Sequence, residues 1–405
     1  MATNTFVTCS IVAKETLAIL ENMLAFASGA NRDWEDEFTG NQSRGYSPGQ
    51  TIQIKRPPRY TYRAGRVAVP QATVETSTPL TVQQGGCDIN FYGIERTLSI
   101  QQMSQKIRAA VATVVNEIDR QGLALAAATT FNTIGTPGTL PSTQALALAA
   151  ATQMNQRLDE MGTPRDAQRR SMVMNPAFNA SMIQGFAGLF NSQKTLAEQY
   201  DSGLLVPSLG LAYAMDQNVA TVTNGTQAVA GTNINGANQT GASVTVVALT
   251  GTLLAGQKIT LPGVFAVNPQ SRNSTGTLAQ FVVTANCAAG VTSIPISPAI
   301  VTSGAFQNAS ASPTNGSPFT VFGTASGSFA ANVAFHKDAF TLAMVPMYAP
   351  PGGKGVIDVA VESYKGMNLK VTEFYDGVND NYIMRIDVLF GWAATYPELA
   401  VLYAV

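Results

Sequence analysis

Residues 97–131 have the spacing of one long α-helix, and this segment restricts the fold more than any other. Its apolar residues recur every three or four positions and so share one helical face: Ile100, Met103, Ile107, Val111, Val114, Ile118 and Leu125. Arg108, Glu117, Asp119 and Arg120 lie off that face, and the one interior glycine, Gly122, costs about 1 kcal/mol. At 1.5 Å per residue the helix would be roughly 50 Å long. Such a helix needs a large partner, and we expect extended strands from before and after it to provide one.

The composition excludes several broad classes of protein. Of the 405 residues, 45% are hydrophobic and only 12% are charged, about half the usual share. Disorder requires low hydrophobicity together with high net charge, so the chain as a whole is expected to fold. The net charge of −1 provides no basic field that would indicate binding to nucleic acid.

Cysteine usage and the apolar runs indicate a reducing compartment and no membrane. Cys9, Cys87 and Cys287 are far apart and odd in number, which favours free thiols over a disulfide framework. The first residues lack the basic and apolar regions of a signal peptide, and no uncharged run is apolar enough to span a bilayer. We therefore expect a soluble protein made in a reducing cytoplasm.

An amphipathic segment and an acidic cluster begin the chain. Residues 7–27 have a helical pattern of apolar residues. Four acids then surround Trp34: Asp33, Glu35, Asp36 and Glu37. Runs of charge usually form a solvated loop or a helix end. The alternative is that these carboxylates contact cations of another subunit.

Residues 45–86 are expected to form a long extended loop. Residues 51–54 alternate like a strand, and four prolines after them prevent a long helix or a central strand: Pro57, Pro58, Pro70 and Pro79. The cations Lys55, Arg56, Arg59, Arg63 and Arg66 have only Glu75 as a nearby acid. Three interpretations remain open. The loop is a floppy surface hairpin, an arm whose cations meet carboxylates of a neighbouring subunit, or a nucleic-acid binder that uses Tyr60 and Tyr62.

Between 140 and 215 helices and strands alternate. Helices are expected at 144–161 and at 175–190, with a buried strand at 171–174 and a β-like return at 203–214. These elements would pack as a compact α/β layer.

Between Gln217 and His336 only Lys258 and Arg272 carry a formal charge. Short alternating runs are separated by turn residues, as in a small sandwich or barrel; they lie at 243–247, 258–261, 280–284, 293–296 and 319–322. We expect a separate all-β module at about 216–330, inserted at an exposed loop of the α/β layer. Its Gly/Asn/Thr-rich stretch 224–242 is expected to be a mobile loop.

The end of the chain is expected to return to the long helix. Residues 358–376 and 382–392 are predicted to be strands around the turn 376–380, and residues 398–405 a final strand. In the second strand the even-numbered residues from Tyr382 to Trp392 are apolar and share one face, with Arg385 and Asp387 on the other. We expect the apolar face to pack on the long helix.

The sequence gives no sign of catalytic chemistry, of a cofactor or of a metal site. His336 is the single histidine, so one chain cannot form a histidine-based metal cluster. It has no nucleophile signature near it, and we interpret it as a residue at the start of a helix rather than as part of a catalytic triad. The glycines at 352–355 lack the spacing of a phosphate-binding loop and are read as a turn.

The order of these parts resembles the HK-ninety-seven-type major capsid proteins of tailed bacteriophages. The motifs that carry the resemblance are 172–176 (MVMNP), the Gly-Leu-Leu-Val stretch from Gly203, 334–340 (AFHKDAF), 385–392 (RIDVLFGW) and 397–399 (PEL). The β module is similar to the insertion domain of the P-twenty-two-like coat proteins, at 256–260, 263–267 and 280–283. Each motif is loose, and the specific part is their order over nearly the whole chain.

The resemblance implies an α+β phage capsid fold with an inserted small β-barrel. Its parts would be an N-terminal arm (1–44), an extended loop (45–86), a peripheral domain with the spine helix (87–139), an axial domain (140–215 and 331–355), the inserted domain (216–330) and C-terminal strands of the peripheral domain (356–405). It also implies hexamers and pentamers in an icosahedral virion shell, assembly in the host cytoplasm with a scaffolding protein, a portal protein, and packaged double-stranded DNA bound without sequence specificity. In relatives a loop of the inserted domain makes charged contacts, whereas 224–242 has no charge.

Two other functions are weighed against a capsid protein. The charge-poor β module could bind a receptor or glycan on the surface of a virion, or His336 could serve an enzyme. The candidate intersubunit contacts are Lys55, Arg56, Arg59, Arg63, Arg66, Asp33, Glu35, Asp36 and Glu37.

Overall fold

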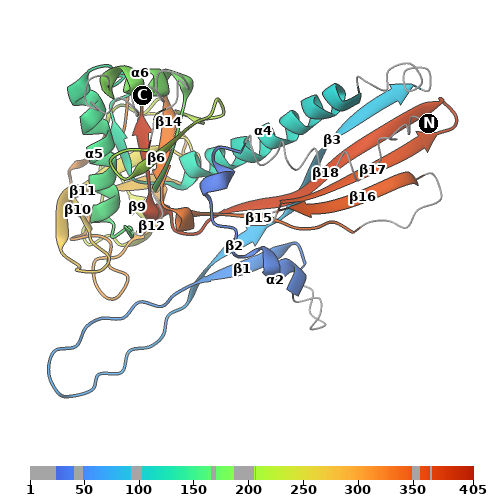
Figure 1. Cartoon of the computed structure of the whole chain (residues 1–405). Helices are drawn as coiled ribbons and strands as arrows, with labels where there is room; N and C mark the ends of the chain where they lie inside the picture. Colours follow the sequence, from blue (N-terminus) through green and yellow to red (C-terminus); the bar gives the residue numbers. More distant parts are fainter. Residues whose placement is uncertain are drawn as a thin grey trace. The chain divides into compact units, whose positions relative to one another are not determined.

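The computed structural model of the chain describes residues 24–40, 49–92, 103–165, 170–186, 205, 207–348, 356–364 and 367–405. The fold is α+β, and the chain divides into two compact units (Figure 1). The first unit consists of Met1–Ile54, Ser77–Gly122 and Thr341–Ala393, and the second of Lys55–Thr76, Leu123–Phe340 and Ala394–Val405. Most of the helix expected at 7–27, Ile100 of the long helix, the end of the helix expected at 175–190 and the turn at 352–355 lie outside the described residues.

The long helix is confirmed as α4 (Met103–Thr129), about 40 Å at 1.5 Å per residue. Val111, Val114 and Ile118 of the predicted stripe are buried. Further along, Leu123 is buried and Leu125 only partly so, because a straight helix drifts relative to a fixed repeat of apolar residues.

The first unit is an antiparallel sheet packed on α4. Its strands are β3 (Gln83–Tyr92), β15 (Phe340–Met344), β16 (Val356–Tyr364), β17 (Met367–Asp376) and β18 (Asn381–Ala394), in the order β15-β18-β17-β16 with β3 also on β18. As predicted, Met384, Ile386, Val388 and Phe390 of β18 share one core with Val111, Val114 and Ile118 of α4. Figure 1 shows α4 lying along this sheet.

The prediction of one strand over 358–376 is wrong, because the chain folds back within it. Tyr364 pairs with Met367, so the segment forms the two strands β16 and β17. The pairing sets Ala360 opposite Val371, and both are buried in the core shared with α4. Folding back therefore lets both halves bury their apolar residues on the same face.

A smaller cluster in the first unit holds the ends of the extended loop. β1 (Thr51–Arg56) pairs with β2 (Thr76–Thr81), which confirms the strand predicted at 51–54. Ile54 and Leu80 pack with Phe38 of the short helix α2 (Glu35–Gly40). A 3-10 turn, η1 (Ala27–Gly29), precedes α2.

The second unit contains the predicted α/β layer. Its sheet has the order β4 (Thr133–Gly135), β19 (Ala400–Ala404), β14 (Ser328–Phe335), β5 (Arg170–Met174) and β6 (Leu211–Met215), with β7 (Thr221–Thr223) also on β14. The helices α5 (Gln144–Glu160) and α6 (Pro176–Phe186) bury Met154, Leu158 and Phe178 in one core with Met172 and Val401 of the sheet. The final strand begins later than predicted, because the 3-10 turn η5 (Pro397–Leu399) precedes it.

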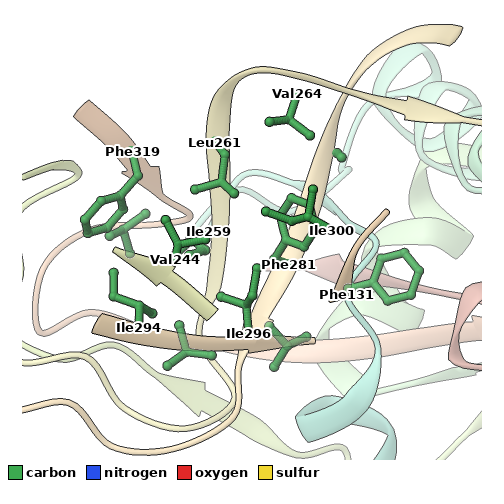
Figure 2. Close-up of a cluster of buried hydrophobic side chains, with 14 of the residues drawn as sticks. Phe131, Val244, Ile259, Leu261, Val264, Phe281, Ile294, Ile296, Ile300 and Phe319 are labelled. Carbon is green, nitrogen blue, oxygen red and sulfur yellow. The ribbon is translucent and has the colours of Figure 1, made fainter. Parts of the chain in front are cut away.

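The charge-poor module is a six-stranded barrel. Its strands are β8 (Ala230–Asn233), β9 (Gly241–Thr245), β10 (Lys258–Val267), β11 (Ser274–Val283), β12 (Ser293–Ile300) and β13 (Pro318–Val321), in the order β8-β13-β10-β11-β12-β9. The two end strands meet, since Asn235 N donates to Thr245 O (3.0 Å) and Val247 N donates to Asn233 O (2.8 Å). Ile259, Phe281, Ile294 and Phe319 fill its interior (Figure 2).

The expectation that 224–242 is a loop is wrong, because this stretch contains β8 and closes the barrel. Asn224 Nδ2 donates to Phe322 O and to Thr324 O, at 2.9 and 3.0 Å. The closing contact is an isolated bridge between Ile234 and Val246, just beyond the two end strands. A composition of Gly, Asn and Thr conceals the strand, since these residues are also typical of turns.

The barrel begins and ends on neighbouring strands of the α/β layer. β7 precedes the barrel in the chain and β14 follows it, and these two strands pair through Val222 and Phe329. Ala331 N also donates to Ala220 O, at 2.9 Å. Ends that lie side by side are what an insertion requires.

Candidate assembly site

Within the extended loop (45–86), residues 57–75 between β1 and β2 contain no helix or strand (Figure 1). Pro57 and Pro58 cannot donate backbone hydrogen bonds and so end the strand pairing. Beyond these prolines the two sides of the loop are joined by hydrogen bonds of side chains instead of backbone pairs. Gln71 accepts from Thr61 N (2.8 Å) and donates to Thr61 O (2.7 Å), and Tyr60 Oη lies 3.0 Å from Thr73 Oγ1. The loop thus keeps an extended hairpin form without a core.

The cations at the base of the loop have partners within the same chain. Lys55 Nζ lies 3.0 Å from Glu75 Oε2, and Arg59 Nη2 lies 3.2 Å from Glu398 Oε1. The guanidinium of Arg56 lies over the ring of Tyr396, 5.4 Å from its centroid. Sequence reasoning missed Glu398, because it is far away along the chain.

The tip of the loop is exposed. Arg63 donates to the carbonyl oxygens of Gly65 and Val67. Arg66 is exposed and has no hydrogen bond or ion pair to any residue that the structure describes. In the same stretch Tyr62 is 92% exposed, and Val67, the residue after Arg66, is 80% exposed. A cation close to exposed apolar side chains can contact another protein surface.

The acidic candidates belong to the start of α2. Glu35 Oε1 accepts from Met344 N (3.2 Å) and from Arg32 Nε (3.0 Å), and burial raises the pKa of Glu35 although Arg32 opposes the rise. Asp33, Asp36 and Glu37 are exposed. The ion pairs of the loop cations in this chain are with Glu75 and Glu398 rather than with these four acids.

His336 has the structural role predicted from the sequence. It is the N-cap of a 3-10 turn, η4 (Lys337–Ala339), where its Nδ1 accepts from Asp338 N at 3.4 Å. Among the described residues no cluster of His, Cys, Asp and Glu could hold a metal ion. In the same residues no helix combines the length and the hydropathy needed to cross a membrane. Cys87 and Cys287 are free thiols, as expected, and Cys9 lies outside the described residues.

Comparison with known proteins places the chain in a family. The sequence model of the family "P22 coat protein - gene protein 5" matches residues 1–402. The chain therefore belongs to the P22 coat protein family. It is a phage major capsid protein, a non-enzymatic virion component that assembles with copies of itself into a shell. The family does not favour the receptor-binding alternative.

The other comparisons add distant likenesses. No curated protein sequence matches the chain. A structure from Mycobacterium phage Che8 has 12% identity and a TM-score of 0.47, covering 100% of this chain and 94% of that one. The capsid of cyanophage P-SCSP1u has 11% identity and a TM-score of 0.42, with coverage of 89% and 84%. The capsid of Myoviridae phage XM1 has 8% identity and a TM-score of 0.42, with coverage of 94% and 91%. The assignment rests on the family match.

Proposed function

We propose that the extended loop lies across a neighbouring copy of the chain, in hexamers and pentamers of an icosahedral head. The observation that carries this proposal is the exposed tip, where Tyr62 and Val67 face water beside Arg66. Burying an apolar side chain of this size against another subunit would stabilise the contact by about 1.5–3 kcal/mol. An isolated subunit leaves these side chains in water. The exposed acids Asp33, Asp36 and Glu37 are proposed as contacts for Arg63 and Arg66 of another copy.

The remaining partners are proposed by analogy with the family. A scaffolding protein would guide assembly in the host cytoplasm, DNA would enter through a portal protein, and the shell would enclose double-stranded DNA without reading its sequence. The net charge of −1 supports the last point, because tight binding to DNA rests on many cationic contacts with phosphates.

The domain limits given above are also part of the proposal. Residues 216–330 would be an inserted domain, supported by the closed barrel and by its adjacent ends at β7 and β14. The axial domain would combine 140–215 with 331–355, supported by the pairing of β5 with β14.

Electron microscopy of the expressed full chain tests the proposal. We expect closed hollow particles when the chain is expressed with or without a scaffolding protein. Small soluble oligomers under both conditions would contradict it. Density for residues 57–75 over an adjacent subunit would support the role of the loop, and density folded back onto its own subunit would refute that role.

A further inference from the structure

The second unit contains a cavity of about 380 Å³ where distant parts of the chain meet. Its walls come from the base of the extended loop, the residues after α4, the end of α5, strands β10 and β11, the segment 298–308 and the turn η5. The intersubunit contacts proposed at the tip of the extended loop do not use this cavity, although Arg56 and Arg59 at the base of the loop line it.

The cavity has the size and walls of a site for a small organic molecule. Ligand pockets have volumes of about 300–1,000 Å³ and mostly apolar walls. A cavity of about 150 Å³ accommodates benzene, so a volume of about 380 Å³ suits a body of about two rings. Four aromatic residues line it, Phe131, Phe281, Phe306 and Tyr396, and the first two are labelled in Figure 2.

The charge of the lining is positive. Arg56, Arg59 and Arg157 all line the cavity. Glu398 pairs with Arg59 at 3.2 Å, and Glu160 pairs with Arg157 at 3.1 Å. Among the described residues Arg56 has no carboxylate partner, and its guanidinium lies over the Tyr396 ring. One positive charge is therefore left to attract an anion.

Three polar atoms of the lining residues are buried without a hydrogen bond to any described residue. They are Nε of Arg56, Nε of Arg157 and Oδ1 of Asn132. Arg157 is only 6% exposed and Asn132 only 1%. Buried polar atoms in native proteins are nearly always hydrogen-bonded, so the chain by itself leaves this part of the unit incompletely hydrogen-bonded.

We propose that this cavity binds a small organic anion whose body has about two apolar rings. Its anionic group accepts from Arg56, and its rings lie against Phe131 and Phe306. Because the walls join the base of the loop to the barrel and to the end of α4, the bound anion holds these parts of the unit together. This site does not depend on how copies of the chain assemble.

Binding of 2-naphthoate to the full-length chain, followed by ligand-observed NMR and by thermal unfolding, tests the proposal. We expect saturable binding at one site and a rise in melting temperature, because a ligand that binds only the folded state stabilises it. The uncharged 2-naphthamide is expected to bind at least tenfold more weakly. Absence of naphthoate binding, or equal binding of the amide, would overturn the proposal.

Variants separate this cavity from other surfaces. Arg56→Gln is expected to weaken naphthoate binding at least tenfold, and Ala299→Leu, which fills the cavity, to weaken it similarly. Arg66→Gln is the matched control, because this exposed arginine of the same loop lies outside the cavity, and its affinity is expected to equal that of the wild type. Wild-type affinity in both cavity variants, each shown to be folded by circular dichroism, would overturn the proposal.

Discussion

Lys258 Nζ donates a hydrogen bond to the main-chain oxygen of Ala127, 2.7 Å away. Lys258 begins β10 and is 1% exposed, while Ala127 lies in the last turn of α4. The amine therefore binds one of the carbonyl groups that a helix leaves unpaired at its C-terminal end. Arg272, the other charged residue of the barrel, also donates to a main-chain oxygen, that of Tyr60, at 2.7 Å. Both charges of this charge-poor module thus bind main-chain oxygens outside it.

The buried amine of Lys258 is expected to make stability depend on pH. Burial lowers its pKa from 10.5 to about 7. Between these two values the unfolded chain binds a proton that the folded chain does not, so stability rises with pH, by up to about 1.4 kcal/mol per pH unit. Lys258→Met removes this contribution. The measurement is urea unfolding from pH 6 to 9.5. The free energy of unfolding of the variant minus that of the wild type should be larger at acidic pH than at alkaline pH.

Lys55→Met is the control for that experiment, because the Lys55 side chain is 71% exposed. Its unfolding free energy should follow that of the wild type at every pH. A difference between Lys258→Met and the wild type that stays constant from pH 6 to 9.5 would show that Lys258 is not a buried amine with a lowered pKa.

A second prediction concerns Asp119 in the first unit. Its carboxylate accepts from Ala25 N (2.7 Å), Phe26 N (3.1 Å) and Ala27 N (3.1 Å), and the residue is 2% exposed. Asp119→Ala leaves these donors without that acceptor and should lower the free energy of unfolding by about 2–4 kcal/mol. Chemical denaturation measures this change. Glu117→Ala is the control, because its pair with Arg120 is exposed and should contribute less than about 1 kcal/mol.

Asp119 also shows where sequence reasoning stops. The helical period of α4 and the alternation in β18 depend on neighbours along the chain, so their core was predictable. Asp119 lies beside the apolar stripe, a position in the sequence that does not distinguish it from a solvated acid. Its partners are backbone groups more than 90 residues away along the chain. Gln280 is similar, since it accepts from Thr133 N (2.6 Å) and donates to Thr133 O (2.7 Å). At the assembly site the cations were predictable, but Glu398 as the partner of Arg59 was not. Tertiary contacts of single polar residues leave no period in the sequence.

Gly122 is predicted to matter for packing rather than for helix propensity. A Cβ at this position would lie 2.7 Å from ring carbons of both Phe26 and Trp392, whose ring centroids are 5.2 Å apart. Gly122→Ala should therefore lower the free energy of unfolding, although alanine is favoured in a helix by about 1 kcal/mol. Thr113→Ala, at an exposed position of the same helix, should be neutral or slightly stabilising. A higher free energy of unfolding for Gly122→Ala would show that the rings of Phe26 and Trp392 move to accommodate the added methyl group.

The barrel is predicted to fold by itself. All buried residues of its core except Phe131 and Met161 come from 216–330, and its strands close into a ring. An excised 216–330 fragment should give the dispersed amide NMR spectrum of a folded β protein. A 236–330 fragment lacks β8, leaves the barrel open, and should give a collapsed spectrum. Matching spectra from the two fragments would show that β8 does not complete the fold.

Reversing the charge at the tip of the extended loop should weaken assembly and leave the subunit folded. Arg63 and Arg66 are exposed, and their side chains make no ion pair with the part of the chain that the structure describes. The double variant Arg63→Glu with Arg66→Glu should therefore have nearly the same free energy of unfolding as the wild type. Particle yield, measured by sedimentation, should fall and should depend on salt, because exposed charges are screened within about 10 Å at 0.1 M salt. Lys55→Glu with Glu75→Lys keeps the pair at the base of the loop and should assemble normally. A wild-type yield from the tip variant at low salt would remove electrostatics from the proposed contact and leave only Tyr62 and Val67 to form it.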